Sequence, residues 1–101
     1  MIYGVVSVRV KEGKLEEFLE LFKSNAVTVG KEKGCIRYFS LVDIDAGLPI
    51  QTFEKNVVTI LEQWESVEAL HDHFAAPHMT AYFEKEKEFV EGVTVKMLQE
   101  A

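Results

Sequence analysis

The chain has 101 residues, of which 48% are hydrophobic and 28% charged. This balance is typical of one soluble globular domain and excludes a disordered or fibrous chain, so we expect a single domain over residues 1–101. Seventeen acidic residues against 11 basic ones give a formal net charge of −6. The basic residues are scattered rather than gathered into a stripe, which argues against nucleic acid as a partner.

No segment of the sequence predicts membrane insertion or export. No apolar run approaches the roughly 18–20 residues that a membrane-spanning helix needs. The first ten residues, MIYGVVSVRV, lack the basic start and small-residue cleavage site of a secretion signal. Cys35 is the single cysteine, so one chain can form neither an internal disulfide nor a cluster of thiolate metal ligands. We therefore expect a cytoplasmic protein without a membrane partner.

The first part of the chain predicts a strand, a long helix and a second strand. Residues 2–10, IYGVVSVRV, alternate and are rich in β-branched residues, as strands are. From Glu12 onward apolar residues recur at helical spacing, which predicts an amphipathic helix that ends near Gly30 or Gly34. Residues 35–42, CIRYFSLV, predict a second strand, and the stretch DIDAGLPIQT after it predicts a loop.

The second part predicts a strand, two consecutive helices and a final strand. Residues 56–64, NVVTILEQW, form the third predicted strand. Its inward side chains should be those of Val58, Ile60, Glu62 and Trp64. Ser66 is a suitable N-cap for the next helix, and Pro77 suits the first position of another. Residues 93–98, VTVKML, predict the last strand.

The order β-α-β-β-α(α)-β predicts a ferredoxin-like α+β fold, with an antiparallel sheet and helices on one face. The other face would carry the side chains of Tyr3, Val5, Val57 and Leu61. That is more apolar surface than a small monomer usually leaves in water. We therefore expect a homodimer that packs sheet against sheet, as a dimeric α+β barrel.

His73 is the histidine that should point toward the core. Leu70, His73 and Phe74 share the inner helix face, because His73 and Phe74 follow Leu70 by three and four residues. His71 lies at the edge of the same helix. Two interpretations of His73 stay open: a general base that takes a proton from a substrate, or a core histidine bonded to a backbone carbonyl. His71 and His73 diverge by about 200° around the helix, so they cannot ligate one metal ion together, and no metal site is predicted.

Other polar and aromatic residues of this region also allow two interpretations. Glu62 is either a buried carboxylate that orients His73 or a solvated residue at the sheet edge. Trp64 is either core or a platform for a ligand. His78 and Tyr82 are one helical turn apart and either flank the mouth of a pocket or lie on the surface.

Two stretches of the sequence resemble a known family. They are KEKGCIRY at 31–38 and VVTILEQWESVEALHDHFAAPHMTAYF at 57–83. The shared pattern is an E-x-G-C-x-x-Y strand start, a strand that ends in E-Q-W-E-S, and a P-H-M-x-A-Y turn into a helix. This pattern resembles the antibiotic biosynthesis monooxygenase family, most closely its quinol monooxygenase branch, over about residues 3 to 99.

The resemblance implies a ferredoxin-like homodimer with a pocket between sheet and helices in each subunit. It implies oxidation of quinols or related polyhydroxylated aromatics by O2, with no metal or flavin cofactor. Matched by position, His73 and Glu62 would be catalytic, with His73 as the base and Glu62 orienting it. The residues that would bind the small aromatic substrate are Tyr38, Trp64, His78, Tyr82 and Phe83.

Two other functions remain open on the same scaffold. One is an isomerase of small phosphorylated signalling sugars, whose phosphate would need converging cations; Arg37, Lys33 and Lys55 are the obvious donors. The other is a non-catalytic dimer that binds a small ligand, because fold does not fix function. We expect specificity to depend on the loop 43–55, acting as a lid.

Overall fold

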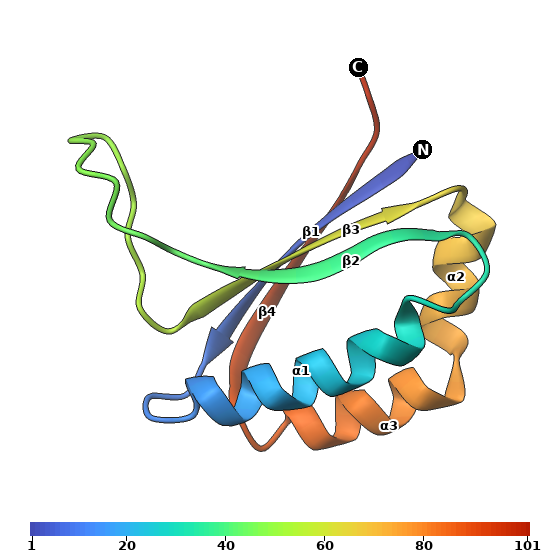
Figure 1. The fold of residues 1–101 in the computed structure, drawn as a ribbon, viewed down its shortest axis with the longest axis horizontal. Helices are drawn as coiled ribbons and strands as arrows, with labels where there is room; N and C mark the ends of the chain where they lie inside the picture. Colours follow the sequence, from blue (N-terminus) through green and yellow to red (C-terminus); the bar gives the residue numbers. More distant parts are fainter.

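The computed structural model describes residues 1–101 as a four-stranded antiparallel sheet with three helices on one side (Figure 1). In chain order the elements are β1 (Ile2–Val10), α1 (Leu15–Val29), β2 (Cys35–Val42), β3 (Val57–Trp64), α2 (Val67–Ala75), α3 (Pro77–Glu86) and β4 (Val90–Leu98). The strands lie in the order β2-β3-β1-β4. This confirms the predicted ferredoxin-like α+β fold. The last strand begins three residues earlier than predicted.

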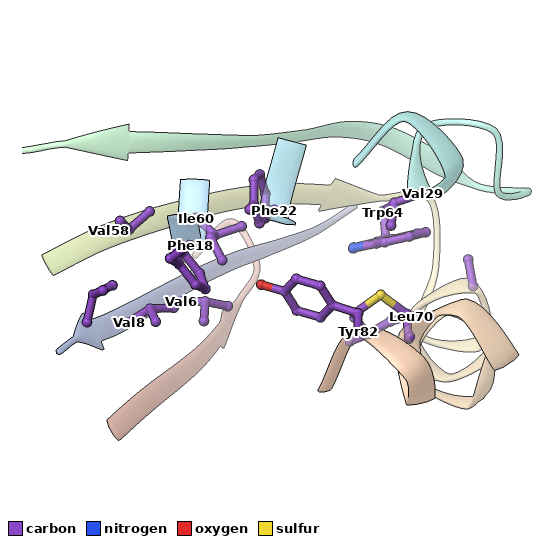
Figure 2. Packing of buried hydrophobic residues seen from close by; sticks show 13 residues of the cluster. Val6, Val8, Phe18, Phe22, Val29, Val58, Ile60, Trp64, Leu70 and Tyr82 are labelled. Carbon is purple, nitrogen blue, oxygen red and sulfur yellow. The ribbon is translucent and has the colours of Figure 1, made fainter. Parts of the chain in front are cut away.

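The core lies between the helix-facing side of the sheet and the three helices. Val6 of β1 pairs with Ile60 of β3, so both side chains point to the same side. Phe18 and Phe22 of α1 lie against that side, as Figure 2 shows, and both are fully buried. Burial of each such side chain stabilises the fold by roughly 1.5–3 kcal/mol. The helical spacing in the sequence therefore predicted the correct face of α1.

The turn between α1 and β2 is held tightly against α2. Gly30 caps α1, as predicted. Gly34 has φ +85°, a conformation that favours glycine. A Cβ on Gly34 would also lie only 2.6 Å from the Cβ of Ala69 in α2. Both features require glycine, and the close packing brings residues 31–34 against α2.

Both helix starts predicted for the second part of the chain are confirmed. The Ser66 hydroxyl accepts a hydrogen bond from the Ala69 amide at 3.1 Å and so caps α2. Pro77 occupies the first turn of α3. Within α2, His73 is 1% exposed and Leu70 is buried, whereas His71 is exposed. Phe74, expected on the same inner face, packs against His73 but is still 41% exposed, so it is only partly covered.

The other side of the sheet carries no helix (Figure 1). Tyr3, Val5 and Leu61 are half-buried there, as expected for an uncovered apolar face. Val57 differs from the prediction, because it is buried within the single chain. Its strand partner Arg9 lies 3.8 Å from the carboxylate of Glu54, so the end of the β2–β3 loop lies close to the end of β1.

None of the three helices has the length and apolar character required to cross a lipid bilayer.

Candidate active site

A cavity of about 60 Å³ lies between the sheet and helices α2 and α3. Its polar lining residues are Tyr38, Glu62, His73, Tyr82 and Glu86. The rest of the lining is apolar and consists of Val6, Val8, Ile60, Phe74, Met79, Phe83, Val93 and Val95. Phe74, Val93 and Val95 are between 41% and 49% exposed, so they form its rim. The site is thus an apolar pocket with a few polar groups, the usual form of a small-molecule site.

Most of the site residues expected from the sequence meet at this cavity. Tyr38, Glu62, His73, Tyr82 and Phe83 all line it. Trp64 does not line it but is fully buried behind His73, with the two ring centroids 4.6 Å apart. His78 faces a different, open groove between α1 and α3. No residue of the loop 43–55 lines the cavity.

His73 is held by a carboxylate that the sequence analysis did not single out. Its Nδ1 lies 2.9 Å from Oε2 of Glu32, in the turn before β2. Nε2 of His78 lies 2.8 Å from the same oxygen. Glu62, the expected partner of His73, makes no hydrogen bond to it. The signal for Glu32 was its place as the first residue of the E-x-G-C-x-x-Y pattern.

Aromatic rings surround His73 on three sides. The Trp64 ring packs on it, tilted, at 4.6 Å, and the rings of Tyr38 and Phe74 make T-shaped contacts with centroids at 5.4 and 5.2 Å. Tyr38 in turn stacks on Phe22 of the core at 5.1 Å. Since Nδ1 bonds to Glu32, Nε2 is the ring nitrogen that remains for a ligand in the cavity.

Glu62 is a buried carboxyl that bonds to its neighbour on the strand. Nε1 of Trp64 donates to its Oε1 at 2.9 Å. Burial raises the pKa of Glu62, while the bond from Trp64 and the nearby His73 oppose this shift. Gly4 pairs with Glu62 across β1 and β3, and a Cβ on Gly4 would overlap the Glu62 side chain. The lack of a side chain at Gly4 therefore makes room for this carboxyl.

The far end of the cavity holds a phenol without a partner. The hydroxyl of Tyr82 is the one buried side-chain polar atom that makes no hydrogen bond. In Figure 2 it points from α3 toward Val6 and Phe18. Burial, with the nearby carboxyl of Glu86, raises the pKa of Tyr82, and burial also raises the pKa of Glu86. Burial and the charge of Glu62 raise the pKa of Tyr38. Both phenols therefore stay protonated at neutral pH and can donate hydrogen bonds.

Neither a metal site nor a reactive thiol is present among the remaining polar side chains. No three histidine, cysteine, aspartate or glutamate side chains are placed to hold a metal ion. Burial raises the pKa of the Cys35 thiol, with a further contribution from Glu32, so this thiol is a poor nucleophile.

Replacing Glu62 with glutamine should change how stability depends on pH. Because the folded-state pKa of Glu62 is raised above its ordinary value of 4.5, its contribution to stability is present at lower pH and is lost as pH rises through the folded pKa. Glutamine does not ionise and can still accept from Trp64. Urea unfolding should show Glu62→Gln gaining stability relative to the parent chain between pH 4 and pH 7. Parallel pH profiles for the two chains would contradict the raised pKa.

Comparison with known proteins gives consistent matches over most or nearly all of the chain. The family profile described as "Antibiotic biosynthesis monooxygenase" matches residues 1–85. The Escherichia coli K12 protein named "Probable quinol monooxygenase YgiN" is 34% identical over 101 residues, covering 98% of this chain and 97% of that protein. A crystal structure of a conserved protein from Methanosarcina mazei Go1 has a TM-score of 0.86 at 25% identity, covering 99% of this chain and 92% of that one. Protein SO0527 from Shewanella oneidensis has a TM-score of 0.82 at 31% identity, covering 96% and 87%.

Proposed function

Because the chain belongs to the antibiotic biosynthesis monooxygenase family, we propose that it oxidises quinols or related polyhydroxylated aromatics with O2, without metal or flavin. The observation that supports this most is the setting of His73. It is 1% exposed, lines an apolar cavity and has its Nδ1 bonded to a carboxylate. A relative at 34% identity is named "Probable quinol monooxygenase YgiN".

The residues around the cavity suit the first step of such a reaction. A free phenol has a pKa near 10 and is mostly neutral at pH 7, whereas its phenolate gives an electron to O2 far more readily. Nε2 of His73 takes the proton from a quinol hydroxyl. One oxygen atom then enters the ring and the other leaves as water, so quinol and O2 give a hydroxylated quinone and water. The unpartnered hydroxyl of Tyr82 donates to the reduced oxygen or to the second substrate oxygen.

Access of a ring to the cavity requires side chains at the rim to move. The cavity of about 60 Å³ is smaller than the roughly 300–1,000 Å³ typical of ligand sites. Phe74 and Phe83 stack at the rim with their centroids 6.2 Å apart, and Phe74 is 41% exposed. Rotation of Phe74 toward solvent opens the cavity on the side of β4, and Tyr38 and Phe83 then flank the substrate ring.

Oxygen uptake by the metal-stripped, cofactor-free protein tests this function. With menadiol as substrate, we expect consumption of O2 above the autoxidation rate, with a hydroxylated quinone as product. Heat-denatured protein at the same concentration is the control. Uptake equal to autoxidation across a panel of benzene and naphthalene quinols would contradict the proposal and favour a ligand-binding protein.

The cavity does not suit a phosphorylated substrate. No lysine or arginine lines it. Arg37 lies over the ring of Phe39 at 4.4 Å, and both residues border a hollow on the uncovered side of the sheet. An isomerase acting on sugar phosphates needs cations that converge on the phosphate. The geometry therefore favours the oxidation of a neutral aromatic substrate.

The uncovered side of the sheet supports a homodimer. Tyr3, Val5, Phe39 and Leu61 line a hollow of about 270 Å³ there, and no element of the same chain covers it.

Light scattering at micromolar concentration should give twice the chain mass of 11.5 kDa. Leu61→Glu should shift the protein to monomer, because a charge would be buried in the interface. Val27→Glu, on an exposed position of α1, is the matched control. A parent chain that scatters as a monomer would exclude the dimer.

A further inference from the structure

Three ionisable side chains far apart in the sequence form one hydrogen-bonded cluster. Glu32 lies in the turn before β2, His73 near the end of α2 and His78 at the start of α3. Oε2 of Glu32 bonds to Nδ1 of His73 at 2.9 Å and to Nε2 of His78 at 2.8 Å. The three side chains run from the cavity to the surface, since His73 is 1% exposed and His78 is 27% exposed.

The chemistry of these contacts fixes which nitrogen of each ring carries a proton. An ionised carboxylate has no proton to donate and can only accept, so both nitrogens that contact it must carry hydrogen. Neutral His73 is then protonated at Nδ1, and its lone pair is on Nε2; His73 itself lines the cavity. With the opposite tautomer, Nε2 would carry the proton and His73 could not accept one from a substrate. Contact with Glu32 thus decides whether His73 can act as a base.

The backbone holds Glu32 in place for this contact. Its amide donates to the Val29 carbonyl at 3.0 Å, and its carbonyl accepts from the Cys35 amide at 3.2 Å. The Gly34 carbonyl accepts from the Glu65 amide at 2.9 Å, which ties the turn to the end of β3. The second contact, from His78, restrains the carboxylate from α3. The carboxylate is therefore oriented before any ligand binds.

We propose that Glu32 is a positioning residue for the base: held by His78, its carboxylate fixes His73 as the Nδ1–H tautomer, with Nε2 free toward the substrate. This inference rests on the proposed function for its catalytic consequence, but not for the tautomer itself. Two histidines and a carboxylate can also form a metal site, yet here both nitrogens point at the carboxylate oxygen within hydrogen-bond distance. The three side chains are therefore not arranged around a common point where a metal ion could bind. We call this hydrogen-bonded cluster the clamp.

The tautomer can be measured without substrate. In the full chain labelled with 15N-histidine, long-range 1H–15N NMR distinguishes protonated from unprotonated ring nitrogens. We expect His73 of the parent chain to be protonated at Nδ1 and unprotonated at Nε2 near neutral pH. Glu32→Ala should abolish this preference. Glu32→Gln should keep it, because one amide oxygen can take the place of Oε2 and accept from both rings.

Kinetics supply the second measurement. Glu32→Ala should lower kcat for menadiol oxidation by about 10² with KM little changed, as expected when an orienting carboxylate is lost and the base adopts the wrong tautomer. Glu32→Gln should recover a large part of that loss. Glu20→Gln, at an exposed position of α1, is the matched control and should behave as the parent chain. Thermal unfolding of each variant checks that the fold is kept.

The possible results separate the two proposals. Loss of the Nδ1–H tautomer in Glu32→Ala and its retention in Glu32→Gln would support the clamp. A parent His73 protonated only at Nε2, or a tautomer unchanged in Glu32→Ala, would overturn it. If the tautomer responds as expected but the parent chain oxidises no quinol, the clamp is supported and the proposed function is the part that fails.

Discussion

Replacing His73 with alanine should lower the rate of quinol oxidation by about 10² or more, the range expected when a general base is removed. The variant lacks the only imidazole in the cavity lining, so the substrate hydroxyl has no neutral base near it. Steady-state oxygen uptake gives the rate. Added imidazole, which fits the space left by the side chain, should restore part of it. Such rescue would separate loss of the base from loss of the fold.

His71→Ala is the matched control, because His71 lies two residues away on the same helix but is exposed. Its rate should stay within about twofold of the parent, as is usual for surface substitutions away from special features. His73→Gln keeps more of the side-chain volume and should fold normally while remaining as slow as His73→Ala. A His73→Ala rate within about twofold of the parent would remove His73 from the role of base.

Sequence periodicity was sufficient to separate these two histidines. Apolar residues at spacings of three and four define one inner face of α2, and His73 lies on that face while His71 does not. The strand pattern likewise placed Glu62 and Trp64 on the buried side of β3, and both are buried. Such predictions succeed because they depend only on the period of one element and on the direction of the core.

The contacts between elements could not be derived in the same way. Glu32 reaches His73 across 41 positions of sequence, through a turn whose placement depends on the packing of Gly34 against Ala69. Helical period also predicted an inner position for Phe74. Phe74 does line the cavity and stacks on Phe83 of α3, but it lies at the rim and is 41% exposed. The hydrogen-bond partner of His73 and the exposed fraction of Phe74 depend on tertiary packing, which the spacing of residues along one helix does not predict.

The role of Gly4 also depends on a contact between elements, because it follows from the register of β1 and β3. Gly4 lies opposite Glu62, and a Cβ there would overlap the Glu62 side chain and come within 3.1 Å of the Met97 sulfur. Glu62 cannot easily move aside, because it is buried and bonded to Trp64. Gly4→Ala should therefore lower the free energy of unfolding by roughly 1–3 kcal/mol, the usual cost of overpacking a core.

A double-mutant cycle tests whether Glu62 is the cause. In a Glu62→Ala background the overlap disappears, so adding Gly4→Ala should lower the free energy of unfolding by less than about 0.5 kcal/mol. The difference between the costs of Gly4→Ala in the two backgrounds is the coupling energy between residues 4 and 62. Gly92→Ala is the control: Gly92 is also in a strand, but a Cβ there meets nothing within 4 Å. It should be neutral or slightly stabilising, since alanine loses less backbone entropy than glycine on folding. Equal costs of Gly4→Ala in both backgrounds would show that Glu62 does not require this glycine.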